Sequence, residues 1–357
     1  MVSFGGPEKT EDVLPFLRNV TRGKDIPDER LAEVGEHYYQ FGGRSPINDQ
    51  CRALLAGIRD DFAGAGLDLP VYWGNRNWHP YLTDTVREMY ADGVRRALVF
   101  FTSAYASYSS CRQYRENLAH AIAEAQADDL TLVRLPHHYQ RTGFLLPFVD
   151  RTAEAIAELP AGSRLVFVTH SIPTAMNDAS GPASVGGGRY VAEHLEAAAW
   201  ISERVSESLT AASGRSIDQR WDLVYCSRSG PPSQPWLEPD VNDHLEKLAG
   251  DGVPGVALIP LGFVSDHMEV IYDLDTEAMQ TAERLGMAAR RIPTPGTDPR
   301  YVRLFRELVS EQLDEQAGVP EPPAASSAEV IGRPVWTNCP VDCCRNLRGD
   351  RPVACSG

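Results

Sequence analysis

Three carboxylates lie four residues apart in the second half of the chain, at Glu269, Asp273 and Glu277. On a helix this spacing places the three side chains along one face. No Lys or Arg occurs between them, and like charges at this spacing cost roughly a few tenths of a kcal/mol per pair. The row therefore needs either a solvated face or a cation. The apolar run 256–261, which ends in Gly262, is typical of a buried strand, so we favour a cleft over an ordinary acidic surface.

A single imidazole follows another strand-like segment. Residues 165–169 are mostly apolar and predict a buried parallel strand, which is followed by His170, Ser171, Ile172 and Pro173. Open α/β sheets bind their ligands at the carboxyl ends of strands. A lone His is more often a structural cap, but its position at a strand end favours a functional role. We therefore expect His170 and the acidic row to face each other across a cleft, where they could hold a divalent cation and accept protons.

The composition limits the classes of function. The chain has 357 residues, of which 43% are hydrophobic, so it is long enough for two domains with a large core. A net charge of −15 argues against nucleic acid as a partner. The apolar runs are much shorter than the roughly 20 residues that span a bilayer, and no signal peptide is recognisable, so we expect a cytoplasmic protein. Only four residues precede the first Gly-Gly-Pro turn. We therefore expect a frayed first strand, or a natural start upstream of Met1.

Strand-like and helix-like segments alternate along the chain. The expected strands are 69–73, 97–101, 130–135, 165–169, 223–226 and 256–260, and the expected helices are 46–62, 82–92, 113–126, 145–159, 188–213 and 241–248. This alternation predicts an α/β fold, in which two Rossmann-like halves each contain a doubly wound, largely parallel sheet. The expected divisions are a first half at 1–160, a second half with the metal site at 161–317, a linker at 318–332 and a cysteine-rich tail at 333–357.

Four of the seven cysteines crowd into the last twenty residues, at Cys339, Cys343, Cys344 and Cys355. The remaining three are scattered along the body of the chain. In a reducing compartment such a group indicates ligation of a metal or a cluster more than disulfides. Sets of four cysteines hold both zinc and iron–sulfur clusters, and the residues alone favour zinc.

Five motifs in order resemble the ferrochelatase family. They are Ser-Phe-Gly-Gly-Pro at 3–7, Phe-Gly-Gly-Arg-Ser-Pro-Ile at 41–47, His-Ser-Ile-Pro at 170–173, Trp-Leu-Glu-Pro-Asp at 236–240 and Gly-Phe-Val-Ser-Asp-His-Met-Glu at 262–269. The resemblance covers roughly residues 1–315. It is strongest to the actinobacterial branch, which is similar to coproporphyrin ferrochelatases.

The resemblance implies insertion of Fe²⁺ into coproporphyrin III to give coproheme, with release of two pyrrole protons, in haem biosynthesis. Protoporphyrin IX is the alternative substrate for the same chemistry. By resemblance, His170 and Glu269 form the catalytic, metal-binding pair, in which a neutral His170 accepts a proton, and Asp273 and Glu277 are supporting carboxylates. A rigid cleft could pucker the porphyrin by using the binding energy of the rest of the macrocycle.

The resemblance also assigns porphyrin contacts to Ser45, Tyr114, Tyr38 and Phe4. Phe4 stands where some bacterial members have a Tyr that ligates iron, so that contact is absent or replaced. Thr21 stands where some members have an Arg near a propionate, although Arg22 follows it.

The tail resembles the C-terminal 2Fe–2S extension of some ferrochelatases, which takes three tail thiolates and one thiolate from the body of the protein. Cys111 is the body cysteine that we expect to ligate. Since adjacent thiolates seldom ligate one small cluster together, we expect Cys343 or Cys344 to be the spare among the four tail cysteines. Zinc is the alternative occupant.

Other residues carry less specific expectations. We expect Asp266 and His267 to be structural residues at a helix start. Residues 75–78 are either part of a site or a turn with a packed Trp, and Tyr105 lines either an aromatic floor or the core. A non-catalytic tetrapyrrole carrier or iron–sulfur sensor on the same scaffold is the competing class of function. The composition is compatible with a monomer.

Overall fold

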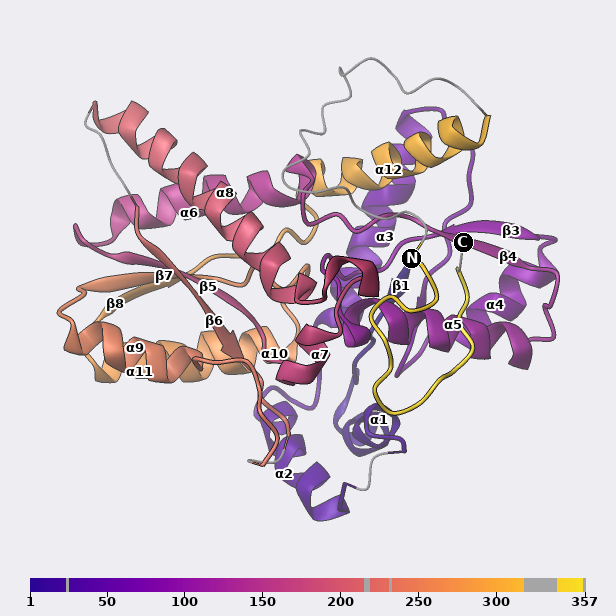
Figure 1. Ribbon diagram of the computed structural model, residues 1–357, viewed down its shortest axis with the longest axis horizontal. Coiled ribbons are helices and arrows are strands. Elements are labelled where there is room, and N and C mark those ends of the chain that lie inside the picture. Colours follow the sequence, from indigo (N-terminus) through magenta and orange to yellow (C-terminus); the bar gives the residue numbers. More distant parts are fainter. Residues whose placement is uncertain (24–25, 215–218, 231–232, 318–338, 356–357) are drawn as a thin grey trace.

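The computed structural model describes the chain except for residues 24–25, 215–218, 231–232, 318–338 and 356–357 (Figure 1). The expected linker at 318–332 and the start of the expected tail, 333–338, lie outside the described residues.

A four-stranded parallel sheet forms the second half of the molecule. Its order is β6 (Trp221–Cys226), β5 (Arg164–His170), β7 (Gly255–Ile259) and β8 (Ala288–Arg291). The central strands β5 and β7 are buried on both faces, which explains why their sequences are continuous apolar runs. Because all four strands are parallel, their carboxyl ends meet at one edge of the sheet.

Short parallel strands form the first half. β1 (Val2–Ser3) pairs with β2 (Gly74–Asn75), and β3 (Arg96–Val99) pairs with β4 (Thr131–Arg134). The amide of Val2 donates to the Phe100 carbonyl over 2.8 Å, and the amide of Thr102 donates to the Val2 carbonyl over 3.0 Å. These two bonds join the strand pairs in the order β2-β1-β3-β4. The first strand is as short as the sequence predicts.

Helices cover both sheets (Figure 1). They are α1 (Val13–Val20), α2 (Asp28–Tyr39), α3 (Ile47–Gly64), α4 (Leu82–Ala91), α5 (Gln113–Glu124), α6 (Thr142–Glu158), α7 (Thr174–Asp178), α8 (Arg189–Ser213), α9 (Val241–Gly250), α10 (Met268–Val270), α11 (Met279–Arg284) and α12 (Pro299–Ala317). Two π-helical segments, η2 (Tyr108–Arg112) and η4 (Ile271–Ala278), and two short 3₁₀ segments, η1 (Thr10–Asp12) and η3 (Ala183–Val185), complete the set. The α/β class with parallel sheets is confirmed.

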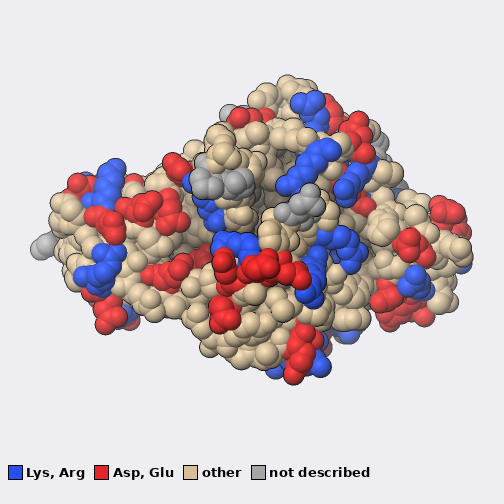
Figure 2. Space-filling model, turned by 90° about the horizontal axis from the view of Figure 1, so that it is seen from below, with Lys and Arg blue, Asp and Glu red and all other residues tan. Residues whose placement is uncertain are grey.

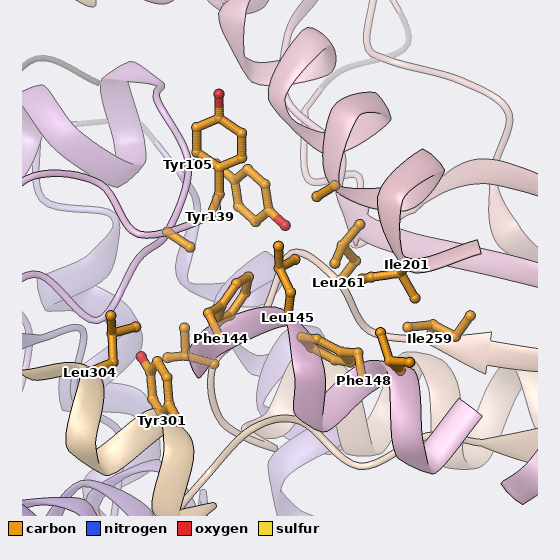
Figure 3. Packing of buried hydrophobic residues seen from close by; sticks show 14 of the residues in the cluster. Tyr105, Tyr139, Phe144, Leu145, Phe148, Ile201, Ile259, Leu261, Tyr301 and Leu304 are labelled. Atoms are coloured by element: carbon orange, nitrogen blue, oxygen red, sulfur yellow. The ribbon is translucent and has the colours of Figure 1, made fainter. Parts of the chain in front are cut away.

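The two halves share one apolar core because two helices cross between them. Helix α6 precedes residue 160 yet packs against α8 and β7, while α12 follows the second sheet and packs against α3 and α6. Figure 3 shows the result, with Phe144 and Phe148 of α6 between Tyr301 of α12 and Ile259 of β7. Among the described helices, none has the combined length and apolar character that a membrane span requires.

Candidate active site

An imidazole and a carboxylate face each other at two neighbouring strand ends. His170 is the last residue of β5, and Glu269 lies in α10, which follows the adjacent strand β7. The His170 Nε2 and Glu269 Oε1 atoms are 3.5 Å apart, and their side chains are 31% and 41% exposed. The structure thus brings together the two residues that the sequence pairs, and both remain accessible to a ligand.

Each partner changes the pKa of the other. Burial disfavours the imidazolium, but the charge of Glu269 and the hydrogen bond to it outweigh burial and raise the pKa of His170 to about 9. Burial likewise opposes the carboxylate of Glu269, yet the charge of His170 lowers the pKa of Glu269 to about 2. The metal-free pair is therefore an imidazolium and a carboxylate near neutral pH. The carboxylate lies close enough to favour a proton on His170 in the metal-free protein, and the neutral, proton-accepting His170 expected in catalysis remains a prediction.

The loop before Glu269 is fixed by contacts with the first half of the molecule. The Gln50 side chain, from α3, accepts a hydrogen bond from the Asp266 amide over 2.8 Å and donates to the Asp266 carbonyl over 3.1 Å. His267 Nδ1 accepts from the Glu269 amide over 3.2 Å and so caps α10. The structure agrees with the structural roles expected for Asp266 and His267.

The acidic row lies on a helix, as expected, but most of that helix has π geometry. Asp273 and Glu277 lie in η4, in which backbone hydrogen bonds join residues five apart. The charges of Glu269 and Glu277 both raise the pKa of Asp273, so the three carboxylates are neighbours. Glu269 and Asp273 are half-buried and Glu277 is exposed. The row thus runs from the His170 pair outward to solvent.

Asp273 carries the largest pKa shift within the row. Burial, together with the charges of Glu269 and Glu277, raises the pKa of Asp273 to about 7, while a hydrogen bond donated by the Ser227 hydroxyl opposes this rise. Ser227 follows β6 and has a φ of 62°, a conformation that costs energy for a residue with a side chain. Sequence reasoning missed Ser227, whose only signal is its position directly after a strand.

One of the expected porphyrin contacts lies near the pair. Tyr38, at the end of α2, has its pKa raised well above the ordinary value by burial and then by the charges of Glu269 and Asp273, which places its phenol near both carboxylates. Phe4 is half-buried after β1, and its ring contacts Phe16 edge-on at 6.2 Å between centroids. Phe16 contacts Tyr38 in the same way, at 5.9 Å, so Phe4 belongs to the aromatic cluster that contains Tyr38.

The other two expected contacts are almost fully buried. Ser45 packs beneath the Gly5-Gly6-Pro7 turn, where its amide donates to the Pro7 carbonyl over 2.9 Å. Tyr114 packs against Phe101 in the core of the first half. Their contact with a porphyrin remains a prediction.

Arg76 is a candidate that the sequence left open within residues 75–78. Its guanidinium lies 4.5 Å from the Tyr114 ring centroid and 5.5 Å from that of Phe4. Its Nε donates to the Asn117 side chain over 2.7 Å. Burial lowers its pKa, while Tyr114 and Glu116 oppose the change. Arg76 therefore places a cation between two of the expected porphyrin contacts.

Four of the cysteines gather into one buried thiol group, which comprises Cys111, Cys339, Cys343 and Cys344. Cys339 and Cys344 both influence the pKa of Cys111, and Cys339 influences that of Cys343, so these thiols are neighbours. The sulfurs of Cys343 and Cys344 are 3.8 Å apart. Hydrogen bonds from Cys111 and Cys343, together with the nearby Arg134, hold the pKa of Cys339 far below its ordinary value. The Arg134 guanidinium donates to the Cys339 sulfur over 3.2 Å.

Cys355 packs against the core of the first half. Burial raises its pKa, and Arg134, Cys111 and Cys339 also influence it, so Cys355 lies near the thiol group. Cys343 and Cys344 both belong to the thiol group, whereas we expected one of them to be the spare; which tail cysteines ligate remains a prediction. Among the described residues, no three or more His, Cys, Asp or Glu side chains are arranged to hold a metal ion in the structure as it stands.

Acidic and basic side chains are interspersed on the face shown in Figure 2, and no broad basic patch appears there.

The α/β fold and the imidazole–carboxylate pair together define a chelatase type of enzyme. The family model described as Ferrochelatase matches residues 1–313, and the chain belongs to that family.

Three relatives illustrate how far the similarity extends. Coproporphyrin III ferrochelatase from Streptomyces coelicolor is 53% identical over 363 residues, which cover 99% of this chain and 94% of the relative. The protein of the same description from Leifsonia xyli is 46% identical, with 99% and 92% covered. A protein described as Ferrochelatase from Rhodopirellula baltica is 43% identical, with 99% and 95% covered. The match to these relatives includes the cysteine tail, which lies beyond the family model.

Proposed function

We propose that this enzyme inserts Fe²⁺ into coproporphyrin III, releasing two protons and giving coproheme for haem biosynthesis. The observation that carries the proposal is the contact between His170 and Glu269 at adjacent strand ends, with an acidic row leading outward from it. The relatives described as coproporphyrin III ferrochelatases support the choice of substrate.

The roles of the pair follow from their charges. Fe²⁺ as substrate is attracted to the Glu269 carboxylate and displaces the proton that His170 holds in the metal-free state. When iron moves onto the four porphyrin nitrogens, each of the two pyrrole N–H groups loses a proton. The free imidazole of His170 takes one proton, and the carboxylate of Asp273, whose pKa of about 7 suits proton exchange near neutrality, takes or relays the other.

The porphyrin would lie between the two halves, with Tyr38 and Phe4 against the macrocycle and Ser45 and Tyr114 behind it. The Phe4 ring cannot ligate iron, so it supplies an apolar surface only. Arg76 adds a cation that could pair with a propionate carboxylate. Binding energy from these peripheral groups is available to hold the ring in the puckered form that exposes its nitrogen lone pairs.

One experiment separates the substrates and the classes of function. Purified protein is incubated anaerobically with Fe²⁺ and either coproporphyrin III or protoporphyrin IX, beside a His170→Ala variant. We expect faster turnover of coproporphyrin, and loss of turnover but retention of porphyrin binding in the variant. Faster turnover of protoporphyrin would reverse the substrate assignment. Porphyrin binding without metal insertion in the unaltered protein would favour the tetrapyrrole carrier.

We also infer that the thiol group holds a 2Fe–2S cluster, with Cys111, Cys339, Cys343 and Cys344 as ligands. The donor set supports this, since four sulfurs from the body and the tail meet beside a buried Arg134 that can balance anionic charge. Such a cluster requires free thiols, as all seven cysteines are here, and this suits the cytoplasm. The bound cluster would supply electron-transfer or sensing chemistry, and the insertion steps above do not use it.

The absorption spectrum and metal content of anaerobically purified protein test this assignment. We expect visible iron–sulfur absorption, loss of bound iron when any of the four cysteines is changed to Ser, and full iron content in Cys355→Ser. A colourless protein with one zinc ion per chain would replace the cluster with zinc. Iron loss in Cys355→Ser would return Cys355 to the ligand set.

A further inference from the structure

A closed ring of hydrogen bonds lies directly behind the His170–Glu269 pair. The Tyr190 hydroxyl is 2.8 Å from the His170 carbonyl oxygen and 2.8 Å from Thr169 Oγ1. Thr169 Oγ1 is also 2.9 Å from His194 Nε2, and His194 Nδ1 is 2.7 Å from the Tyr190 carbonyl oxygen. All three side chains are buried within the apolar core.

The donor in each hydrogen bond can be assigned by starting from the two backbone carbonyl oxygens, which can only be acceptors. The Tyr190 carbonyl is an acceptor, so His194 Nδ1 must carry the hydrogen, and Nε2 of the neutral ring is then an acceptor. Thr169 therefore donates to Nε2, and the Tyr190 hydroxyl shares its hydrogen between Thr169 Oγ1 and the His170 carbonyl. Three hydrogens therefore serve four contacts, and the single Tyr190 hydrogen lies between two acceptors. The network still links the three buried side chains to the backbone at the end of β5, which restricts their movement.

The ring lies at the junction of the two strand ends that carry the site. Thr169 immediately precedes His170, and a Cβ built on Gly262 would approach its Oγ1 to 2.1 Å. Gly262 also donates its amide to the Val168 carbonyl over 3.2 Å. Gly262 opens the segment that leads to Glu269, so the same threonine contacts the backbone that positions each member of the pair.

Helix α8 anchors the ring from the other side. The Tyr190 amide donates to the Ser180 hydroxyl over 2.9 Å. The Tyr105 ring, from the first half of the chain, stacks on His194 with 3.5 Å between centroids and 17° between planes. The first turns of α8 therefore contact both Tyr105 of the first half and the end of β5.

We propose that Tyr190, Thr169 and His194 are positioning residues that set the separation of His170 and Glu269 through the backbone at the end of β5. The inference rests on the proposed function, because it assigns these residues a role only through that pair. A polar ring adds little net stability to an apolar core, whereas a misplacement of reacting groups by about 1 Å can lower a rate by up to about a hundredfold. The ring therefore matters for rate more than for stability.

The test compares variants that remove or keep a single hydroxyl. Tyr190→Phe and Thr169→Val each delete one hydroxyl, and with it two contacts of the ring, while nearly keeping the shape of the side chain. Thr169→Ser keeps the hydroxyl. With Fe²⁺ and coproporphyrin III, we expect kcat to fall about tenfold in the first two variants. The porphyrin KM should stay within about twofold and the Tm within a few degrees. We expect Thr169→Ser to keep most of the rate, and the double variant to be about as slow as either single one.

Normal kcat in both Tyr190→Phe and Thr169→Val would overturn the inference, as would a Thr169→Ser variant as slow as Thr169→Val. If Thr169→Val does not fold, Tyr190→Phe tests the same ring from the helix side. His170→Ala separates this failure from that of the proposed function. An inactive His170→Ala with a normal Tyr190→Phe rejects the positioning role alone, whereas an active His170→Ala rejects the role of the pair and the positioning role together.

Discussion

At the scale of single residues, the protonation state of His170 is as important to the His170–Glu269 pair as the distance between the two side chains. The pKa of His170 is raised to about 9, because its neighbour Glu269 stays ionised with a pKa lowered to about 2. A metal ion that binds His170 must first displace this proton, since only the neutral imidazole is a ligand. In the proposed mechanism, iron capture and proton release are therefore coupled before any porphyrin binds.

This coupling predicts a pH dependence for metal affinity. Below the pKa of about 9 for His170, the neutral fraction of His170 falls as the pH falls. We therefore expect affinity for a redox-stable probe ion, Co²⁺, to rise by about tenfold per unit between pH 7 and pH 9, and then to level off. Isothermal titration calorimetry at several pH values, without porphyrin, measures the affinity for Co²⁺.

Glu269→Gln is the matched variant for this prediction. It removes the charge that raises the pKa of His170, so the plateau should move down toward the ordinary histidine value of about 6.5, at weaker overall affinity. A plateau that stays near pH 9 in this variant would show that another group controls the titration, with Asp273 as the nearest candidate.

At the scale of elements, the close approach of two strand ends determines whether the site forms. A Cβ on Gly262 would lie 2.1 Å from Thr169 Oγ1 and 2.9 Å from Thr169 Cα, so an alanine there must push the loop after β7 away from β5. We expect Gly262→Ala to destabilise the protein by about 1–3 kcal/mol and to lower kcat more than porphyrin affinity. Urea unfolding and steady-state rates measure the two effects.

Gly64→Ala is the control substitution for Gly262→Ala. Gly64 lies at the end of α3, and nothing is within 4 Å of a Cβ built there. Alanine is favoured over glycine in helices, so its stability should be unchanged or slightly higher. If Gly262→Ala changed the free energy of unfolding and kcat no more than Gly64→Ala does, the close packing of the two strand ends would not be needed for stability or activity.

The elements also show how much the sequence predicts. Strands β5, β6 and β7 lie within one or two residues of the predicted segments. For β5 and β7 this is because burial on both faces gives continuous apolar runs. Strand β8, with the sequence Ala-Ala-Arg-Arg, was missed, because it lies at the sheet edge and Arg291 is paired with Asp266 and Asp275. The π geometry of η4 was equally unpredictable, since carboxylates four apart suit either kind of helix.

For the site, too, the residues that follow an apolar run could be predicted and the others could not. His170 and Glu269 follow apolar runs that predict strands, so their meeting at one sheet edge could be predicted. Tyr190 and His194 come from a helical segment that carries no such signal, and Ser227 has only its position after a predicted strand. The roles of all three depend on contacts between distant parts of the chain. Sequence alone could not place them, because only the packing of α8 and β6 against β5 brings them to the site.

At the scale of the whole molecule, the tail contacts both halves of the chain. The Cys344 amide donates to the Gly181 carbonyl over 3.0 Å in the second half, and the Ala354 amide donates to the Arg115 carbonyl over 3.0 Å in the first. Asn346 donates to both carboxylate oxygens of Glu116, over 3.2 and 3.3 Å. The tail thus adds contacts between the two halves to those made by the core of α6 and α12 and by the Gln50–Asp266 hydrogen bonds.

Asn346 provides a test of this docking that does not depend on any metal. Glu116 is buried beside Arg112, with 3.4 Å between their charged atoms. Asn346→Leu removes its two hydrogen bonds from the tail, so we expect a loss of about 1–3 kcal/mol in the free energy of unfolding. Leu347→Ala, at a side chain that is 56% exposed, should change stability by less than about 0.5 kcal/mol. Equal effects of the two substitutions would contradict a docked tail.

The bridge would be tightened further by metal at the thiol group, because binding energy at a site that exists only in the docked tail is also folding energy of the tail. Anaerobic removal of the metal by a chelator should therefore speed amide hydrogen exchange at Cys343 and Cys344 by at least about tenfold, while the amides of β5 stay protected. Mass spectrometry of the two forms measures this exchange.

Unchanged exchange at both cysteines would mean that the hydrogen bonds of Gly181 and Glu116 suffice to hold the tail. Faster exchange in β5 as well would mean that the metal stabilises the whole molecule, since the thiol group then holds the two halves together through the tail.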